Sequence, residues 1–314
     1  MMVWCDDPIH KVDSMKNILI TGADGQLGRD CQDVLSAGYQ VTAVDIGQLD
    51  IADARAVKKA VNRFKPDILI NCAAFTRVDD CENQFTEAWE ANSEGPANLA
   101  RASAASGTRL VHISTDYVFD GKKPVPEAYT ETDAPNPLSV YGSTKLAGEE
   151  RVLEACADAL VLRTAWLYGD GGKNFIRSIL GRLVNEPQTR LTIVNDQYGS
   201  PTWSRRLALQ IERLLKTRAR GLYHATAEGY CTWYELAREM CEMTGLSGRI
   251  DPCTTADYPT PAVRPQNSIL ENKRLKSETL NQMADWREDL RGFLSAHGEA
   301  LFAELGQKSG EGAS

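Results

Sequence analysis

The sequence predicts an α/β protein in which a doubly wound parallel sheet carries a smaller, mixed α/β lobe. Two observations predict this fold class. From Lys16 onward, short apolar runs rich in β-branched residues alternate with longer amphipathic stretches, and after Trp166 the signals become shorter and less regular. Strands that are apolar throughout and separated by helices are typical of a parallel sheet covered by helices on both faces.

The regular first part of the chain supplies the expected sheet and its helices. The expected strands are Asn17–Thr21, Gln40–Asp45, Asp67–Asn71, Arg109–Ser114 and Ala159–Thr164. The expected helices between them are Leu27–Ala37, Ala52–Phe64, Thr86–Ser106 and Ser139–Ala155. We therefore expect residues 15–165 to form one domain built on this sheet.

Residues 166–305 are expected to form mainly the smaller lobe, with some elements returning to the sheet. The expected helices are Asn174–Val184, Ser204–Arg218 and Thr232–Thr244, and the expected strands are Arg190–Val194 and Gly221–Ala225. Residues 1–14 lack the apolar run of a secretory signal and are expected to be a disordered leader. Residues 306–314 are small and polar and are expected to be a flexible tail.

Charge and composition narrow the class of partner. The chain has 314 residues, with 43 acidic and 35 basic side chains, for a net charge of −8. This balance, without a basic run, argues against nucleic acid or an anionic membrane as a partner. No apolar run approaches the roughly 18 residues of a membrane span. The eight cysteines are spread along the chain without a Cys-x-x-Cys pair, which favours reduced thiols and a cytoplasmic location.

A glycine-rich turn follows the first expected strand. Gly22, Gly25 and Gly28 have the spacing G-x-x-G-x-x-G and lead into a helix that begins near Gln26 and Leu27. Glycines in this place allow a tight turn and let backbone amides approach a pyrophosphate at the helix N-terminus. A surface turn also collects glycine, but the position between a strand and a helix favours dinucleotide binding in a Rossmann domain.

The end of the second expected strand bears on the choice of cofactor. Asp45 lies there, where an acid can bind the adenosine ribose, although a solvated strand end is also compatible with the sequence. An acid disfavours a 2′-phosphate, and Arg29 could offset that repulsion, so NADH and NADPH both stay open. Asp50 and Ile51 follow at a place where the adenine could rest.

Candidate catalytic residues lie at the fourth expected strand and the helix after it. Tyr141 and Lys145 are four residues apart and so share a helix face, which brings an ammonium near a phenol. A phenol of ordinary pKa near 10 needs a shift to exchange protons at neutral pH, and a nearby cation favours that shift. Thr115, at the end of the strand, can hydrogen-bond the same substrate oxygen. A surface Tyr/Lys pair is the alternative, but the order after the glycine turn favours catalysis.

Taken together, these segments resemble the extended short-chain dehydrogenase/reductases and, more narrowly, the dTDP-4-dehydrorhamnose reductase family. The resemblance runs from about Lys16 to about Ala303. Its carriers are TGADGQLG, NCAAFTRVDDCE, HISTDYVFDG, YGSTKLAGE, LRTAWLYG, NDQYGSPT, GLYHA and TPAVRPQNS. It implies hydride transfer from NADPH or NADH to the C4 ketone of a dTDP-sugar.

The resemblance also implies roles for individual residues. Tyr141 would protonate the forming alkoxide, Lys145 would hold the nicotinamide ribose, and Thr115 would polarise the ketone. Cofactor contacts are implied or indicated for Gly22, Gly25, Gln26, Leu27, Asp45, Asp50, Ile51, Ala73, Ala74, Tyr141 and Lys145. Substrate contacts are implied or indicated for Thr76, Thr115, Asp116, Tyr117, Trp166 and Arg264. Arg264 is the candidate for the diphosphate, because a guanidinium binds phosphate with two N–H groups.

Several of these roles have alternatives in the sequence. Trp166 is also compatible with a core position, and Arg264 with a surface ion pair. The residues 195–197 either line the site or only organise a turn. Phe75 stands where some family members carry His. Some members hold Mg²⁺ between subunits, but Trp203-Ser204-Arg205 offers no carboxylate and Asp30 alone would not make such a site, so no metal is predicted.

Two other functions share parts of this pattern. An epimerase or 4,6-dehydratase of the same superfamily keeps its NAD tightly bound, and a dehydratase usually has an Asp-Glu pair after the active Ser/Thr. Here Asp116 is followed by Tyr117, so the Glu is absent. A non-catalytic subunit resembling the regulatory subunit of methionine adenosyltransferase is the alternative from another class. The superfamily also often forms homodimers through helical faces, which makes a homodimer a possible assembly.

Overall fold

A six-stranded parallel sheet forms the centre of the molecule. The computed structural model describes residues 15–186, 188–246 and 249–307. In spatial order the strands are β10 (Gly221–His224), β5 (Leu160–Thr164), β4 (Arg109–Thr115), β3 (Ile68–Asn71), β1 (Asn17–Thr21) and β2 (Gln40–Val44). Every neighbouring pair is parallel. The predicted doubly wound parallel sheet is confirmed, and β10 is an element of the second part that returns to it.

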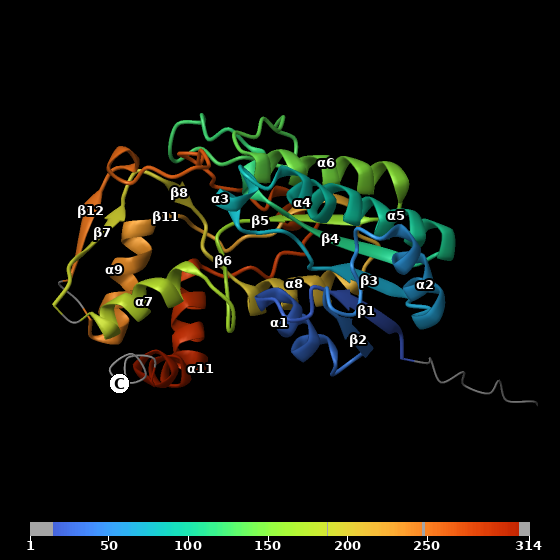
Figure 1. Ribbon diagram of the computed structural model, residues 1–314, viewed down its shortest axis with the longest axis horizontal. Helices are drawn as coiled ribbons and strands as arrows, with labels where there is room; N and C mark the ends of the chain where they lie inside the picture. The colour runs from blue at the N-terminus through green and yellow to red at the C-terminus, as the bar shows by residue number, and fades with distance from the viewer. Residues whose placement is uncertain (1–14, 187, 247–248, 308–314) are drawn as a thin grey trace, which may run out of the picture.

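Helices cover both faces of the sheet (Figure 1). One face packs against α1 (Gln26–Leu35) and α8 (Ser204–Leu215), and the other against α2 (Ala54–Phe64), α5 (Gly95–Ser106) and α6 (Val140–Ala155). Successive strand residues alternate between these two cores, because strand side chains point to opposite sides. In β1, Ile18 and Ile20 lie in the first core and Leu19 in the second. All three are buried, because helices cover both faces of the sheet.

The predicted helix Thr86–Ser106 is instead three consecutive helical segments. These are α4 (Phe85–Trp89), a π-helical turn at Glu90–Glu94 and α5. Pro96 has no N–H to donate to the carbonyl of Asn92, and proline removes this bond wherever it enters a helix. The Asn92 side chain bonds the backbone of Phe75 instead, with 2.8 Å from Phe75 N to Oδ1 and 3.0 Å from Nδ2 to Phe75 O. The π-helical turn thus lies just before Pro96, at a residue whose side chain makes a tertiary contact.

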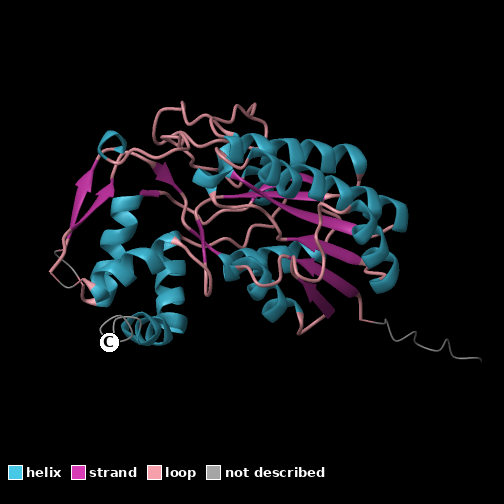
Figure 2. Ribbon diagram, viewed as in Figure 1, coloured by secondary structure: helices cyan, strands magenta, loops and turns pink. Residues whose placement is uncertain are grey.

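Much of the second part of the chain lies beside the sheet (Figure 2). Its side chains build a separate apolar core. Its helices are α7 (Phe175–Asn185), α9 (Trp233–Thr244) and α11 (Trp286–Gln307). Its paired short strands are β7 (Leu191–Val194) with β12 (Ile250–Cys253), β8 (Tyr198–Gly199) with β11 (Cys231–Thr232), and β6 (Leu167–Tyr168) with β9 (Thr202–Trp203). A short helix, α10 (Lys273–Ser277), also belongs to this part, and another, α3 (Val78–Cys81), belongs to the first part of the chain.

The ends of the second part differ from expectation. No helix or strand is expected after Thr244, yet α11 has 22 residues and packs Leu290, Phe293, Leu301 and Leu305 into this core. The intervals of three residues between Leu290 and Phe293 and of four between Leu301 and Leu305 are a helical signal. This helix includes Gly306 and Gln307, the first two residues of the predicted tail. The predicted leader lies outside the described residues. No helix in the described ranges is long and apolar enough to cross a membrane.

Candidate active site

A cleft of about 630 Å³ opens at the carboxyl edge of the sheet, between the two parts of the chain. Parallel strands expose their carboxyl ends together, so loops that are far apart in sequence meet here. Sixteen of the seventeen predicted site residues line this cleft. They are Gly22, Gly25, Gln26, Leu27, Asp45, Asp50, Ile51, Ala73, Ala74, Thr76, Thr115, Asp116, Tyr117, Tyr141, Lys145 and Trp166. Arg264 is the exception.

The glycine-rich turn forms one end of the cleft and is shaped for a dinucleotide. Gly22 has φ +70°, and a Cβ there would lie 2.6 Å from the Ala73 nitrogen. A Cβ at Gly28 would lie 2.1 Å from the Gly22 oxygen, so α1 starts in contact with the turn. No side chain caps the first amides of α1. These amides carry the positive end of the helix dipole toward the cleft, as pyrophosphate binding requires.

Asp45 has backbone partners at the edge of the same turn. Its carboxylate accepts hydrogen bonds from the amides of Asp24, at 2.9 Å, and Ile46, at 2.7 Å. Arg29 lies outside the cleft and donates from Nε to the Asp24 oxygen at 3.0 Å. The acid that the sequence places near the adenosine ribose therefore also holds the phosphate-binding turn against β2.

Helix α6 places Tyr141 at the centre of the cleft. Ser139 caps the helix by accepting from Gly142 N at 3.2 Å, and a Cβ at Gly142 would lie 2.2 Å from the Tyr117 oxygen. The rings of Tyr141 and Tyr117 meet edge to face, with 5.5 Å between centroids. Burial raises the pKa of the Tyr141 phenol and the Thr115 hydroxyl acts against this rise. Without a bound ligand the phenol is therefore protonated, which is the form that can donate a proton.

Lys145 lies one helical turn after Tyr141 and is 2% exposed. Its Nζ donates to the carbonyl oxygen of Ile113 at 2.6 Å. Burial lowers the pKa of this amine to about 8, while Glu149 and Cys72 act in the opposite direction. An amine with this pKa is mostly protonated at neutral pH and faces the cleft as a cation.

Thr115 and Asp116 complete the polar wall opposite the glycine turn. The Thr115 hydroxyl donates to Asp116 Oδ1 at 3.0 Å and accepts from Tyr117 N at 3.2 Å. Burial raises the pKa of Asp116 to about 6, although hydrogen bonds from Ser268 and Thr115 oppose the shift. Its Oδ2 is buried and has no hydrogen-bond partner among the described residues. Buried polar atoms are usually satisfied, so this oxygen is available to a ligand hydroxyl.

Comparison with known proteins identifies the family. The model of the RmlD substrate binding domain family matches residues 15–298. The dTDP-4-dehydrorhamnose reductase of Streptomyces griseus is 43% identical over 280 residues, which are 87% of this chain and 91% of that protein. The chain belongs to the dTDP-4-dehydrorhamnose reductase family.

Solved structures agree with this assignment. A dTDP-4-dehydrorhamnose reductase from Clostridium acetobutylicum is 42% identical, with a TM-score of 0.86 over 89% of this chain and 99% of that one. The enzyme of the same name from Bacillus anthracis, solved in complex with NADP, is 36% identical and also has a TM-score of 0.86, over 90% of this chain and 99% of that one.

Sequence reasoning missed several residues that line this cleft, Trp233 and Lys173 among them. Trp233, at the start of α9, stacks on Trp166 with 3.5 Å between ring centroids and an interplanar angle of 5°. Lys173 enters from the loop before α7, after Gly171 and Gly172, which have φ values of +77° and +67°. The Gly-Gly-Lys run is a loop signal that could have pointed to Lys173. Nothing local in the sequence indicates that Trp233 meets Trp166.

Arg264 does not line the cleft, and its guanidinium binds the carboxylate of Asp79. Its Nη1 and Nη2 donate to Oδ1 and Oδ2 of Asp79, in α3, at 3.0 and 2.9 Å. Nη1 also donates to the Ala262 oxygen at 3.0 Å. The two-point geometry that suits a phosphate is thus formed with a carboxylate.

The residues 195–197 organise the second part of the chain and do not line the cleft. Asn195 accepts from the Thr232 hydroxyl at 2.7 Å, and Asp196 accepts from Thr255 N at 2.9 Å. Gln197 accepts from Trp233 Nε1 at 3.2 Å and so supports the stacked tryptophan pair.

The side chains that the structure describes do not form a metal site. Within residues 15–186, 188–246 and 249–307, no group of three or more His, Cys, Asp or Glu side chains is arranged to hold an ion. Asp30 accepts a hydrogen bond from the Ser204 hydroxyl, and burial raises the pKa of its carboxyl.

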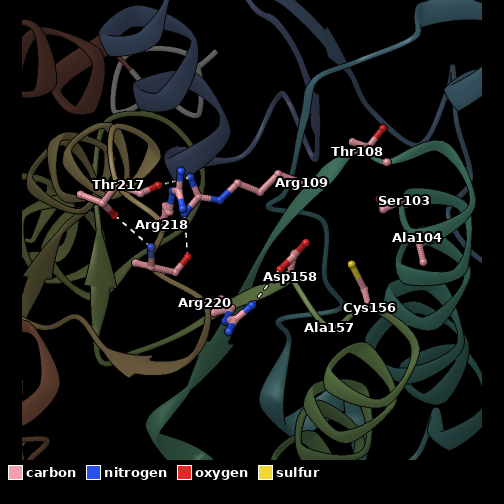
Figure 3. A pocket seen from close by; sticks show the side chains of 12 residues that line it. Ser103, Ala104, Thr108, Arg109, Cys156, Ala157, Asp158, Thr217, Arg218 and Arg220 are labelled. Carbon is pink, nitrogen blue, oxygen red and sulfur yellow. Dashed lines mark hydrogen bonds and ion pairs between the residues drawn. The ribbon is translucent and has the colours of Figure 1, made fainter.

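A second cavity, of about 730 Å³, lies at the amino edge of the sheet. Figure 3 shows its walls at the start of β4, the turn before β5 and the turn before β10. The Arg109 guanidinium donates to four carbonyl oxygens at and beyond the end of α8, at 2.7 to 3.2 Å. Arg220 pairs with Asp158 at 3.3 Å. No predicted site residue lines this cavity, so the cleft at the carboxyl edge is the candidate active site.

Proposed function

We propose that this protein reduces the C4 ketone of dTDP-4-dehydro-β-L-rhamnose to dTDP-β-L-rhamnose with NADPH or NADH, in dTDP-rhamnose biosynthesis. The observation that carries the proposal is the meeting of Thr115, Tyr141 and Lys145 in a cleft whose far end is the glycine-rich turn. The S. griseus relative carries the name of this reductase. Membership in its family supports the same reaction here.

A nicotinamide cofactor bound between the glycine turn and Lys145 would supply the hydride to C4. The protonated Tyr141 then donates its proton to O4, which becomes the alcohol oxygen, so that the ketone gains one hydride and one proton. The Thr115 hydroxyl must exchange its bond to Asp116 for one to O4. The Lys145 cation stabilises the phenolate that remains on Tyr141 and holds the nicotinamide ribose.

NADPH and NADH are both proposed as cofactors. The solved relative from B. anthracis contains NADP. In this chain, Asp45 is held by two backbone amides and Arg29 lies just outside the cleft. A 2′-phosphate would therefore meet a carboxylate whose charge is already partly compensated, whereas a free ribose could hydrogen-bond it.

The substrate is proposed to occupy the side of the cleft lined by Thr76, Asp116, Tyr117 and Trp166. The stacked Trp166 and Trp233 give that side a flat apolar wall, which suits a sugar ring. Arg264 stays the candidate for the diphosphate, on the condition that it exchanges Asp79 for phosphate oxygens. We further propose a cytoplasmic homodimer; neither nucleic acid nor a membrane is a proposed partner.

A coupled assay tests the function. dTDP-glucose is converted by the upstream dehydratase and epimerase, and the loss of NADPH or NADH absorbance is followed when this protein is added. We expect turnover with both cofactors. In the Tyr141→Phe variant we expect kcat to fall by about 10²–10⁴-fold, because the general acid is lost. Binding of NADPH, followed by fluorescence, should hardly change.

Two results would contradict the proposal. Unchanged turnover in Tyr141→Phe would exclude Tyr141 as the proton donor. A purified protein that retains NAD and does not oxidise added NADPH would identify an epimerase or dehydratase instead.

An absolute preference for one cofactor would show that either Asp45 or Arg29 alone determines which cofactor binds.

A further inference from the structure

A buried ion pair joins the catalytic helix to the sheet directly behind the cleft. In this pair, Arg163 of β5 donates to Glu149 of α6, from Nε to Oε1 at 2.9 Å and from Nη2 to Oε2 at 2.6 Å. Each side chain is 3% exposed. A buried ion pair is weak evidence of stability, because desolvation of the two charges opposes their attraction. The pair therefore points to a role besides holding α6 in place.

The pair is aligned with the catalytic residues. Tyr141, Lys145 and Glu149 follow one another at intervals of four residues on α6 and so share a face. Arg163 is in register with Ser114 on β4, next to the pair Thr115 and Thr164. A Cβ at Gly148 would lie 2.1 Å from the Asn92 oxygen, so the helix is in close contact with its neighbour at this level.

The titratable and charged groups around Lys145 come from α6, β5, β4 and the residue after β3. Glu149 lies on its own helix, with Arg163 of β5 behind it; Cys72 lies just after β3, and His112 lies on β4. Burial and the Lys145 cation lower the pKa of His112, so its imidazole is neutral. Glu149 is thus the carboxylate placed to balance the amine.

Arg163 also fixes how Glu149 can act. No ion pair joins Lys145 directly to Glu149 in the part of the chain that the structure describes, and Nζ bonds the neutral carbonyl of Ile113. Arg163 donates to both carboxylate oxygens of Glu149, so the carboxylate is bound by the guanidinium and not by the amine. The amine keeps N–H groups for a ligand in the cleft.

We propose that Glu149, held by Arg163, is the fixed counter-charge that keeps Lys145 protonated and is therefore a positioning residue for the reduction. The link to turnover rests on the proposed function, whereas the electrostatic effect is a property of the free protein. Burial lowers the pKa of the Lys145 amine to about 8, and the Glu149 carboxylate opposes a further fall.

Glu149→Gln tests the proposal on the free protein. Removing the carboxylate disfavours the charged amine, so the pKa of Lys145 should fall by about one unit or more. The measurement is NMR of ¹³C/¹⁵N-labelled lysine across a pH series, with the Lys145 signal assigned by Lys145→Met. The alkaline limb of kcat/KM should move to lower pH by the same amount. Activity should approach the wild-type value again at pH values below the new pKa, which a merely structural defect would not allow.

The matched control is Glu94→Gln. Glu94, in the π-helical turn, pairs with Arg151 of α6 at a half-exposed position, and its loss should leave the pKa of Lys145 unchanged. If Glu149→Gln does not fold, the double variant Glu149→Leu/Arg163→Met removes both charges without leaving one unpaired. It should lower the Lys145 pKa in the same direction, because the carboxylate is the charge that acts on the amine.

The outcomes separate this inference from the proposed function. An unchanged Lys145 pKa in Glu149→Gln, or in the double variant, overturns the inference even if the wild-type protein is an active reductase. If the wild-type protein has no reductase activity but Glu149→Gln lowers the pKa of Lys145, the counter-charge is supported and the proposed function is refuted.

Discussion

At the residue scale, the contact with Asp79 determines whether the Arg264 guanidinium is free to bind a phosphate. Its sequence context resembles a diphosphate ligand, but its guanidinium is bound to Asp79 across 185 residues of chain. The pair is only partly shielded, with side chains 22% and 37% exposed. The hydrogen bonds from Arg264 lower the pKa of the Asp79 carboxyl, which is therefore ionised at neutral pH. A phosphate would have to compete with this carboxylate.

Asp79→Asn distinguishes the two roles of Arg264. If Arg264 binds the diphosphate, weakening its competitor should lower KM for the sugar nucleotide by up to about five-fold, the range of an exposed ion pair. The value of kcat should hardly change. Steady-state kinetics at saturating NADPH measures both constants.

The neighbouring pair provides the control for this prediction. Asp80 pairs with Arg77 on the same short helix and is more exposed, so Asp80→Asn should not change KM. A raised KM in Asp79→Asn would mean that Arg264 only ties the loop of residues 254–264 to α3.

At the scale of elements, two glycines determine where α6 lies. Gly142 contacts the backbone of Tyr117, and Gly148 contacts the backbone of Asn92 in the π-helical turn. Both contacts are with backbone atoms, which cannot move aside as a flexible side chain would. The helix that carries Tyr141, Lys145 and Glu149 is therefore positioned by the absence of two Cβ atoms.

Gly148→Ala should displace this helix. The new Cβ would overlap the Asn92 oxygen, so we expect the free energy of unfolding to fall by about 1–3 kcal/mol, as for overpacking in a core. We also expect kcat to fall, because Lys145 and Glu149 shift with the helix. Urea unfolding and steady-state kinetics on one preparation test both effects.

Gly298→Ala is the matched control for this substitution. Gly298 lies inside α11, and a Cβ there would meet nothing within 4 Å. Alanine at this position should raise the free energy of unfolding by about 0.5–1 kcal/mol through helix propensity alone. Equal stability of Gly148→Ala and wild type would show that α6 adjusts without cost.

At the scale of the whole molecule, the sheet domain is not a continuous stretch of chain. Helix α8 covers one face of the sheet with Leu207, Ile211 and Leu214, and β10 extends its edge. Both come from the part after residue 166. The proposed division at residue 165 therefore describes where the sequence pattern changes, while the folding unit includes later segments.

A fragment of residues 15–165 should not fold alone. It would expose the apolar face that α8 covers, and we expect no cooperative transition in urea by circular dichroism. The full-length chain is the control and should unfold cooperatively. Co-expression with residues 166–307 should restore a cooperative transition if the two pieces associate. A cooperative transition of residues 15–165 alone would refute this view of the folding unit.

The sequence by itself determined the parallel sheet and most of the cleft wall. Alternating strand and helix periods are local signals, and the glycine turn and the Tyr141/Lys145 spacing carry their chemistry within a few residues. Tertiary structure alone decided three other features: the partner of Arg264, the stacking of Trp233 on Trp166, and the pairing of Arg163 with Glu149. Each depends on residues at least 14 positions apart in the chain, and only folding brings them within contact distance.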